Sequence, residues 1–388
     1  MNGTKSALVL SGGGAYGAFG IGVMKVLCAG ASPATGYNPL QADIFTGTSV
    51  GAFNAAVMVD QPDETALDRV LNLERVWLNL MADRPGKCGN GIFRLRGNPG
   101  DYVNPACFTQ PAAAASRIAG DGLAIGSYLL GRTANFLASS AELSNRFLGL
   151  INTSSFIDES PFHDLLNQVI DENRIRRSPR VLQVVATNWV TGQALTFSNS
   201  DFEHDRGARI IMASTAIPGF FPPVAIDDSL FVDGGAVENT PLSPAIEAGA
   251  TELHVIYLDP QPRFIPLKAE PNTVDTMLRV YYLMQASKLN EDIETARWIN
   301  NGLRALNHYQ ENTSWSQEQA RDFVRVAYKI LSDTIYRPLT IHRYFPTMVL
   351  GTQLDLVNFS LGRITDMIAE GERVALVHDC ATNECVLP

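Results

Sequence analysis

The first 260 residues show a pattern of apolar and polar positions that predicts buried strands, each followed by a helix. Short continuous apolar runs at residues 6–10 and 42–48 are typical of strands buried on both faces of a parallel sheet. Helical stretches follow each run, at residues 18–30 and 50–59. A strand, a turn and a helix repeated in this order predict a parallel sheet with covering helices.

The same pattern continues further along the chain. Residues 180–189 and 193–199 predict a strand pair across a short turn, and residues 230–235 and 252–258 predict two more strands. A helix that begins near residue 208 is stopped by Pro218. Residues 62–81 form an amphipathic helix with acids in its first turn, and its apolar face carries Leu67, Val70, Leu71, Trp77, Leu78 and Met81.

Two stretches depart from this pattern before residue 160. Residues 84–111 are irregular, and loops of this length are uncommon unless they are functional. Residues 112–150 are apolar and poor in charge. We interpret them as core helix, with an inserted lid or membrane-contacting cap as the alternative.

From about residue 262 onward the pattern is helical, at residues 274–306 and 320–335, and it carries no chemistry that we can identify. We therefore expect one α/β domain over residues 1–261 and a helical C-terminal extension over residues 262–388 that packs on the core. Neither the role of this extension nor the oligomeric state follows from the sequence.

Composition narrows the class of protein. A chain of 388 residues with 46% hydrophobic content can bury a sizeable core. Its net charge of −10 argues against nucleic acid as a partner, because a protein that binds phosphate backbones needs a basic face. One dense basic cluster is present, and we interpret it as solvated surface, with contact to an anionic membrane as the alternative: Arg174, Arg176, Arg177 and Arg180.

The cysteines do not predict a disulfide framework, because they are few and odd in number: Cys28, Cys88, Cys107, Cys380 and Cys385. We expect Cys380 and Cys385 to be reduced thiols. His378 stands close by, which makes metal binding an alternative, although the spacing matches no known zinc pattern. We expect no metal and no cofactor. The N-terminus begins with a strand rather than a signal peptide, so we expect a cytoplasmic protein, with export by another route left open.

The segment Gly47–Gly51, which reads GTSVG, matches the G-x-S-x-G motif of serine hydrolases. It lies between a predicted strand and a predicted helix, as this motif requires. A sharp turn there exposes the serine hydroxyl above the sheet, and the helix N-terminus favours charge that develops near it. We therefore predict that Ser49 is a nucleophile.

A nucleophilic serine needs a base. None of the six histidines sits in a glycine-marked turn after a predicted strand: His163, His204, His254, His308, His342 and His378. Asp233 does, in the segment LFVDGG. Ligand sites of parallel sheets lie at the carboxyl ends of strands, where both Ser49 and Asp233 map. Burial would raise the pKa of Asp233 enough for a base at neutral pH; a turn-forming aspartate is the alternative.

The glycine-rich stretch near the N-terminus allows two interpretations. Gly12, Gly14 and Gly17 fit the G-x-G-x-x-G dinucleotide fingerprint, but bare backbone amides can equally bind an oxyanion. A dinucleotide site also needs an acid at the end of the second strand, whereas Asp43 stands at its start. We therefore interpret the glycines as oxyanion donors.

The motifs GGGAYG, GTSVG and a late DGG together resemble the patatin-like phospholipase family over residues of about 5–260. The segment ASTAIPGFFPPV also resembles one that members carry before the aspartate. The resemblance implies a three-layer α/β/α sandwich and a lipid acyl hydrolase with a Ser–Asp dyad. By that resemblance Ser49 is the nucleophile, Asp233 the base, and Gly12, Gly13 and Gly14 form the oxyanion hole.

The resemblance also implies the class of substrate, and the sequence departs from the family pattern at one position. We expect a phospholipase A or lysophospholipase that acts on phospholipid or another acyl lipid in peripheral contact with a membrane. A thioesterase or acyltransferase is one alternative, and a non-hydrolytic nucleotide-binding or regulatory protein is another. Tyr16 stands where the family usually has Arg or Lys, so a cation beside the oxyanion loop is missing.

Overall fold

The computed structural model describes residues 4–61, 63–84, 91–95, 118–127, 130, 157–258, 273–311, 316, 318–319, 322, 337–347 and 356–388. Most of the predicted irregular stretch 84–111 lies outside these residues, as do most of the apolar stretch 112–150 and of the predicted helix 320–335. Residues 118–127 are helical. Within the described residues, no helix combines the length and the apolar character that a membrane crossing requires.

The described residues contain a central sheet of eight strands and a separate two-stranded ribbon. Along the sheet the order is β10 (Thr340–Tyr344), β9 (Glu252–Ile256), β1 (Ser6–Leu10), β2 (Ile44–Thr48), β5 (Val181–Asn188), β8 (Ser229–Asp233) and β7 (Val224–Ile226), with β6 (Ala194–Ser198) also paired to β5. The first five are mutually parallel, whereas β6, β7 and β8 pair antiparallel. The ribbon joins β3 (Arg94–Leu95) to β4 (Ile157–Asp158).

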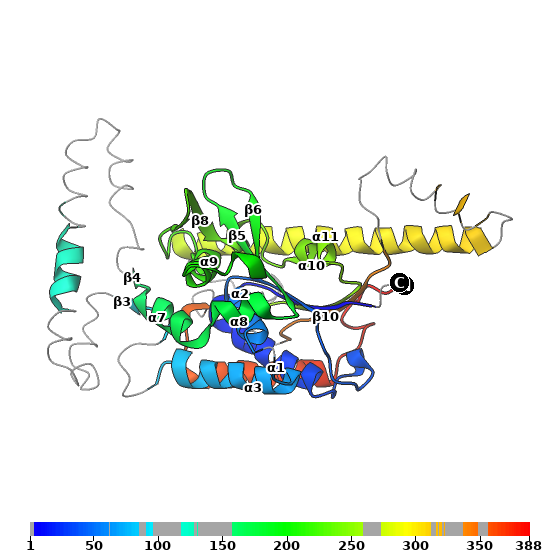
Figure 1. The fold of residues 1–388 in the computed structure, drawn as a ribbon, viewed down its shortest axis with the longest axis horizontal. Helices are drawn as coiled ribbons and strands as arrows, with labels where there is room; N and C mark the ends of the chain where they lie inside the picture. Colours follow the sequence, from blue (N-terminus) through cyan, green and yellow to red (C-terminus); the bar gives the residue numbers. More distant parts are fainter. Residues whose placement is uncertain are drawn as a thin grey trace.

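Helices cover both faces of this sheet, which makes three layers (Figure 1). Alternate residues of β1 face opposite sides: Leu8 and Leu10 belong to one buried apolar cluster, and Ala7 and Val9 belong to the other. The larger cluster contains side chains of α1 (Gly17–Cys28), α2 (Val50–Val59), α3 (Ala66–Val76), α7 (Ser160–Val169), α8 (Glu172–Arg177), α9 (Arg206–Thr215) and α13 (Leu361–Leu376). The smaller cluster contains side chains of α10 (Leu242–Glu247) and α11 (Thr273–Glu311).

Two glycines let the C-terminal helix α13 approach α1. A Cβ atom on Gly22 would lie 2.0 Å from the carbonyl oxygen of Ile368, and one on Gly371 would lie 2.0 Å from that of Phe19. No side chain fits at either position, so the two backbones are in direct contact. Helix α1 follows the glycine-rich loop, and α13 therefore supports the element that carries this loop.

The predicted fold class is confirmed: the structure has a mostly parallel sheet between two helical layers, with a C-terminal region rich in helix. The sequence analysis expected only helices after residue 262, whereas this region also provides the edge strand β10. Its outer side pairs with the chain end, where Ile341 and Val386 exchange backbone hydrogen bonds of 2.8 and 3.0 Å. The predicted helix 62–81 begins at Ala66 and ends in a π-helical turn, Trp77–Met81.

Short 3₁₀ turns complete the described elements at Gly14–Tyr16, Pro33–Thr35, Asn199–Asp201 and Gly234–Ala236. Two of them follow the carboxyl ends of strands β1 and β8, where the predicted chemistry lies.

Candidate active site

Ser49 occupies a strained turn between strand β2 and helix α2. Its backbone has φ 56° and ψ −127°, a conformation that residues other than glycine rarely adopt. The flanking glycines make the turn possible. A Cβ on Gly47 would lie 2.4 Å from the carbonyl of Gly51, and a Cβ on Gly51 would lie 2.2 Å from the carbonyl oxygen of Leu10. The G-x-S-x-G spacing thus lets β2, α2 and β1 pack closely around the serine.

The turn is held by a second serine from helix α9. The backbone amide of Ser49 donates to Oγ of Ser214 over 2.9 Å, and the Ser214 hydroxyl donates to the carbonyl oxygen of Val185 over 2.6 Å. Ser214 is fully buried. It therefore links the serine turn to strand β5 and fixes the direction in which the Ser49 side chain leaves the backbone.

Asp233 ends strand β8, and its side chain meets Ser49. The Asp233 carboxylate lies next to the Ser49 hydroxyl, which lowers the pKa of this carboxyl, and the amide of Gly235 donates to Oδ1 of Asp233 over 2.7 Å. Both side chains are almost completely buried. Gly234 permits this approach, because a Cβ there would lie 2.4 Å from the carbonyl oxygen of Val185.

The environment of Asp233 changes its acidity. Burial raises the pKa of its carboxyl from 3.8 to about 7, while the hydrogen bonds from Gly235 and Ser49 act in the opposite direction. A carboxylate with such a pKa is half protonated near neutral pH. It can accept a proton from a hydroxyl and return it at that pH.

A connecting segment, Glu238–Pro241, lies across the carboxyl ends of β1 and β2. The hydroxyl of Thr48 donates to the carbonyl oxygen of Glu238 over 2.8 Å, and Oγ of Ser11 lies 2.8 Å from Oγ1 of Thr240. This segment follows the turn that contains Asp233. Its hydrogen bonds therefore connect the loop that contains Asp233 to strand β2 and to the start of the glycine-rich loop.

The glycine-rich loop presents its amides differently from residue to residue. The amide of Gly12 donates to the carbonyl oxygen of Asn239 over 3.1 Å, and a Cβ on Gly12 would lie 2.4 Å from Oδ1 of Asn239. Within the part of the chain that the structure describes, the amides of Gly13 and Gly14 have no hydrogen-bond acceptor. Both have positive φ, 159° and 54°. Two adjacent amides are therefore available to an anion, while that of Gly12 is engaged.

An apolar pocket opens above these groups, and both Ser49 and Gly14 line it. Among the described residues around it, Glu159 alone has an ionisable side chain. Its walls come from distant parts of the chain and include Phe53, Met81, Phe93, Phe162, Met212 and Leu356. Such a pocket suits a hydrocarbon chain whose polar end lies against Ser49.

The histidines lie elsewhere. In the described ranges, none is hydrogen-bonded to Ser49 or Asp233. His254, His342 and His378 gather instead at the β9–β10 edge, where the ring centroids of His254 and His342 are 5.0 Å apart. That Asp233, and no histidine, serves as the base for Ser49 stays a prediction.

The basic cluster is partly engaged in ion pairs. Nη2 of Arg174 lies 2.8 Å from a carboxylate oxygen of Asp60, whose side chain is fully buried. Nη1 of Arg176 lies 3.6 Å from Glu203. Both arginines stand on α8, and contact of this helix with a membrane stays a prediction.

Sequence analysis missed the residues that position the predicted site. Ser214 lies in the segment ASTAIPGFFPPV, which pointed to a site without assigning this serine a role. Asn239 and Leu356 gave no recognisable signal, because their contacts with the glycine-rich loop come from distant parts of the chain.

A family model described as patatin-like phospholipase matches residues 8–246. A crystal structure of VipD from Legionella pneumophila aligns with 95% of this chain and 67% of that chain, with 13% identity and a TM-score of 0.34. Similarity at that level says nothing about activity. No curated protein sequence matches the chain.

Proposed function

Because the chain belongs to the patatin-like phospholipase family, whose members act on lipid esters, we propose that it cleaves fatty acyl esters of phospholipids or lysophospholipids with Ser49 and Asp233. The observation that carries this proposal is that the Ser49 hydroxyl adjoins the buried Asp233 carboxylate. This pair lies beside a pocket with apolar walls. Nucleophile, base and acyl site are thus adjacent.

The proposed reaction begins when Oγ of Ser49 attacks the ester carbonyl and Asp233 takes its proton. The tetrahedral oxyanion is stabilised by the amides of Gly13 and Gly14, which have no acceptor among the described residues. Collapse of this intermediate releases the alcohol, which receives the proton from Asp233. The acyl chain stays on Ser49.

The second half of the reaction uses the same groups. A water molecule gives its proton to Asp233 and attacks the acyl-enzyme, and the fatty acid leaves when Ser49 regains its proton. The pKa of about 7 supports both directions of proton transfer at Asp233. The burial of Ser49 and Asp233 keeps bulk water away from both reacting groups.

The pocket supports a long apolar acyl group rather than a small ester. Its described walls are mostly aromatic and aliphatic, and they extend from α2 to the region before α13. A phosphate headgroup would lie outside it, since a buried phosphate without a cation is costly. Tyr16, which replaces the basic residue of the family pattern, is itself buried and adds no positive charge.

The test compares wild-type protein with Ser49→Ala and Asp233→Asn on phospholipid, lysophospholipid, acyl-CoA and a short-chain ester. We expect hydrolysis of the two lipids and covalent labelling of wild-type Ser49 by a fluorophosphonate. Both variants should lose lipid hydrolysis. Preference for acyl-CoA would favour a thioesterase or acyltransferase, and a fully active Ser49→Ala variant would exclude the proposed mechanism.

The matched control is Ser32→Ala. Ser32 is also fully buried and donates to the carbonyl oxygen of Ala375 over 2.8 Å, but it lies between α1 and the end of α13. This variant should keep its activity. Equal loss in Ser32→Ala and Ser49→Ala would point to unfolding rather than to chemistry.

A further inference from the structure

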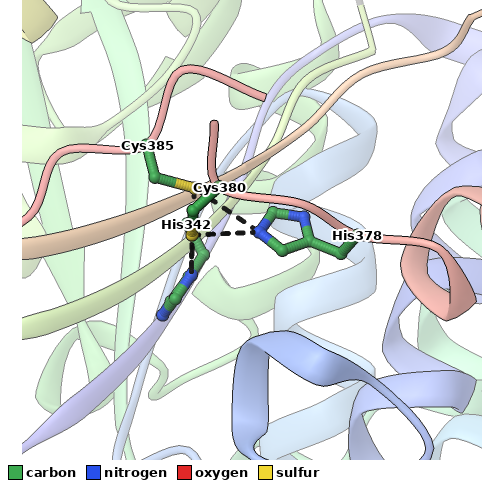
Figure 2. A group of neighbouring side chains, drawn as sticks. All are labelled: His342, His378, Cys380 and Cys385. Carbon is green, nitrogen blue, oxygen red and sulfur yellow. Dashed lines mark hydrogen bonds between the residues drawn. The ribbon is translucent and has the colours of Figure 1, made fainter. Parts of the chain in front are cut away.

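Four side chains with metal-binding atoms converge at the sheet edge formed by β10. They are His342, His378, Cys380 and Cys385 (Figure 2). One ligand atom from each lies within 4.8 Å of every other. Both histidines are buried, and both cysteines are partly buried and free of disulfide bonds. This cluster shares no residue with the predicted active site.

The spacing of these atoms matches a tetrahedral ion. Zinc binds sulfur at about 2.3 Å and imidazole nitrogen at about 2.0–2.1 Å, so a tetrahedral site separates S from N by about 3.6 Å. Sγ of Cys380 lies 3.3 Å from Nδ1 of His342 and 3.6 Å from Nε2 of His378. Sγ of Cys385 lies 3.9 and 3.4 Å from the same two atoms. The four separations bracket the tetrahedral value.

The chain holds the cluster by contacts that do not involve the sulfurs. The turn between the cysteines is closed by the amide of Cys385, which donates to the carbonyl oxygen of Cys380 over 3.0 Å. The carboxylate of Asp379 accepts the amide and hydroxyl of Thr382 within this turn. The side-chain amide of Asn383 donates to the carbonyl oxygen of Arg343 over 3.1 Å, which fixes the turn beside β10. The ligand atoms are therefore oriented in advance.

The surrounding groups support a neutral metal centre. Both imidazoles are buried, and the neutral form of each offers a nitrogen lone pair to a metal ion. Two thiolates cancel the charge of a divalent cation, and a neutral centre costs little to bury. His254 stacks on His342 and holds its own Nδ1 3.0 Å from the Tyr344 hydroxyl, so it packs against the cluster without adding a ligand.

We propose that His342, His378, Cys380 and Cys385 bind one Zn²⁺ ion that fastens the C-terminus to strand β10 and to the end of α13. Four protein ligands leave no open position, so the ion is structural and not catalytic. Binding releases the two thiol protons to solvent and forms two Zn–S and two Zn–N bonds, with no change of oxidation state. This differs from the sequence analysis, which expected reduced thiols and no metal, because His342 is distant from the other three in the chain.

The experiment measures zinc in the reduced, full-length chain purified without an affinity tag. The protein is equilibrated with equimolar Zn²⁺ and separated from free ion, and the metal is counted by mass spectrometry. We expect one zinc per chain, and Co²⁺ in its place should give the visible absorption of a tetrahedral thiolate site. A wild-type chain that retains no zinc under these conditions overturns the proposal.

Variants identify the ligands. Cys380→Ser combined with Cys385→Ser should remove the zinc, as should His378→Ala, whereas Cys28→Ser should keep it because Cys28 is buried in α1. Ser49→Ala should also keep it, which separates this site from the proposed hydrolase. Zinc retained in full by the double cysteine variant overturns the proposal, as does a Cys380–Cys385 disulfide that persists when zinc and reductant are supplied.

Discussion

The hydroxyl of Ser49 faces the carboxylate of Asp233 at the point where strands β2 and β8 meet, because both strands pair with the same edge of β5. Strand β2 ends just before Ser49, and β8 ends at Asp233. The two strands run in opposite directions relative to β5, being parallel and antiparallel to it. The hydroxyl and the carboxylate thus meet where the carboxyl ends of β2 and β8 come together.

We predict that hydrolysis of a neutral ester rises with pH as Asp233 loses its proton. Burial raises the pKa of Asp233 to about 7, and only the ionised carboxylate accepts a proton from Ser49. The profile of kcat/KM should therefore show an acid limb with an apparent pKa near 7 and fall about tenfold per pH unit below it. An acid limb near pH 4 would contradict the burial of this group in the working enzyme.

A second prediction concerns stability. A carboxyl whose pKa is higher in the folded state binds more protons when folded, so its contribution to stability is lost as pH rises from about 4 to about 7. Asp233→Asn lacks this titration. Relative to wild type, it should therefore gain on the order of a few kcal/mol in the free energy of unfolding between pH 4 and pH 8.

Urea unfolding at the two pH values measures this gain. Asp228→Asn is the control for the Asp-to-Asn change itself, because Asp228 is exposed on the turn between β7 and β8. The same difference between Asp233→Asn and wild type at both pH values would argue against a buried, titrating Asp233.

A third prediction separates the two roles of Ser49. The residue has a backbone conformation that costs about 1–3 kcal/mol for a side chain other than glycine. Ser49→Gly and Ser49→Ala should both be inactive, but Ser49→Gly should be more stable by about 1 kcal/mol because glycine tolerates this φ. Thermal and urea unfolding of the two variants give the comparison. If Ser49→Ala proves the more stable, the turn is not strained in solution.

A fourth prediction assigns Ser214 a positioning role. Ser214→Ala removes the acceptor for the Ser49 amide and leaves that amide buried without a partner. We expect a loss of about 1–3 kcal/mol in stability and a lower kcat with little change in KM, since the nucleophile is misdirected while the acyl pocket stays intact. Steady-state kinetics below the unfolding transition measure this split. Ser32→Ala, which also breaks a buried serine hydrogen bond, should lower stability without lowering kcat.

A fifth prediction concerns the oxyanion donors. Gly14→Ala places a Cβ 2.2 Å from the carbonyl oxygen of Leu356 at φ 54°, so the loop must move and its amide must turn away. We expect kcat to fall about 10²–10³-fold, as when an oxyanion donor is lost. Rates are compared per folded molecule, with the folded fraction taken from circular dichroism.

Gly36→Ala is the matched control for this variant. Gly36 has nearly the same φ, 57°, but a Cβ there meets no atom closer than 3.7 Å. It should lose about the same stability to backbone strain and keep its activity. If both variants retain full kcat, the amide of Gly14 is not an oxyanion donor.

Much of the sheet could be predicted from local sequence patterns. Strands such as Ser6–Leu10 are short continuous apolar runs, and the turn at Ser49 has two glycines where backbones touch. Asp233 could be proposed from the sequence because this acid follows a buried strand and precedes two glycines. Each of these signals is contained within a few residues.

The contacts that could not be predicted depend on distant partners. Ser214 supports Ser49 from another helix, and Gly371 contacts α1 only because α13 crosses it. Strand β10 is a short run that resembles many loops, and its pairing with β9 becomes visible only in three dimensions. His342 comes close to Cys380 and Cys385 because it lies on this strand. The secondary-structure propensities of a short segment do not predict contacts between residues that are distant in the sequence.

The pairing of Val386 with Ile341 bears on the tendency of this protein to aggregate. An unpaired outer strand offers a row of amides and carbonyls to which a second chain can attach, and such open edges promote aggregation. Here Val386 pairs with the amide and the carbonyl of Ile341 in that row. Removing Val386 would leave the amide and the carbonyl of Ile341 open to a second chain, so this residue protects part of the outer edge of the sheet.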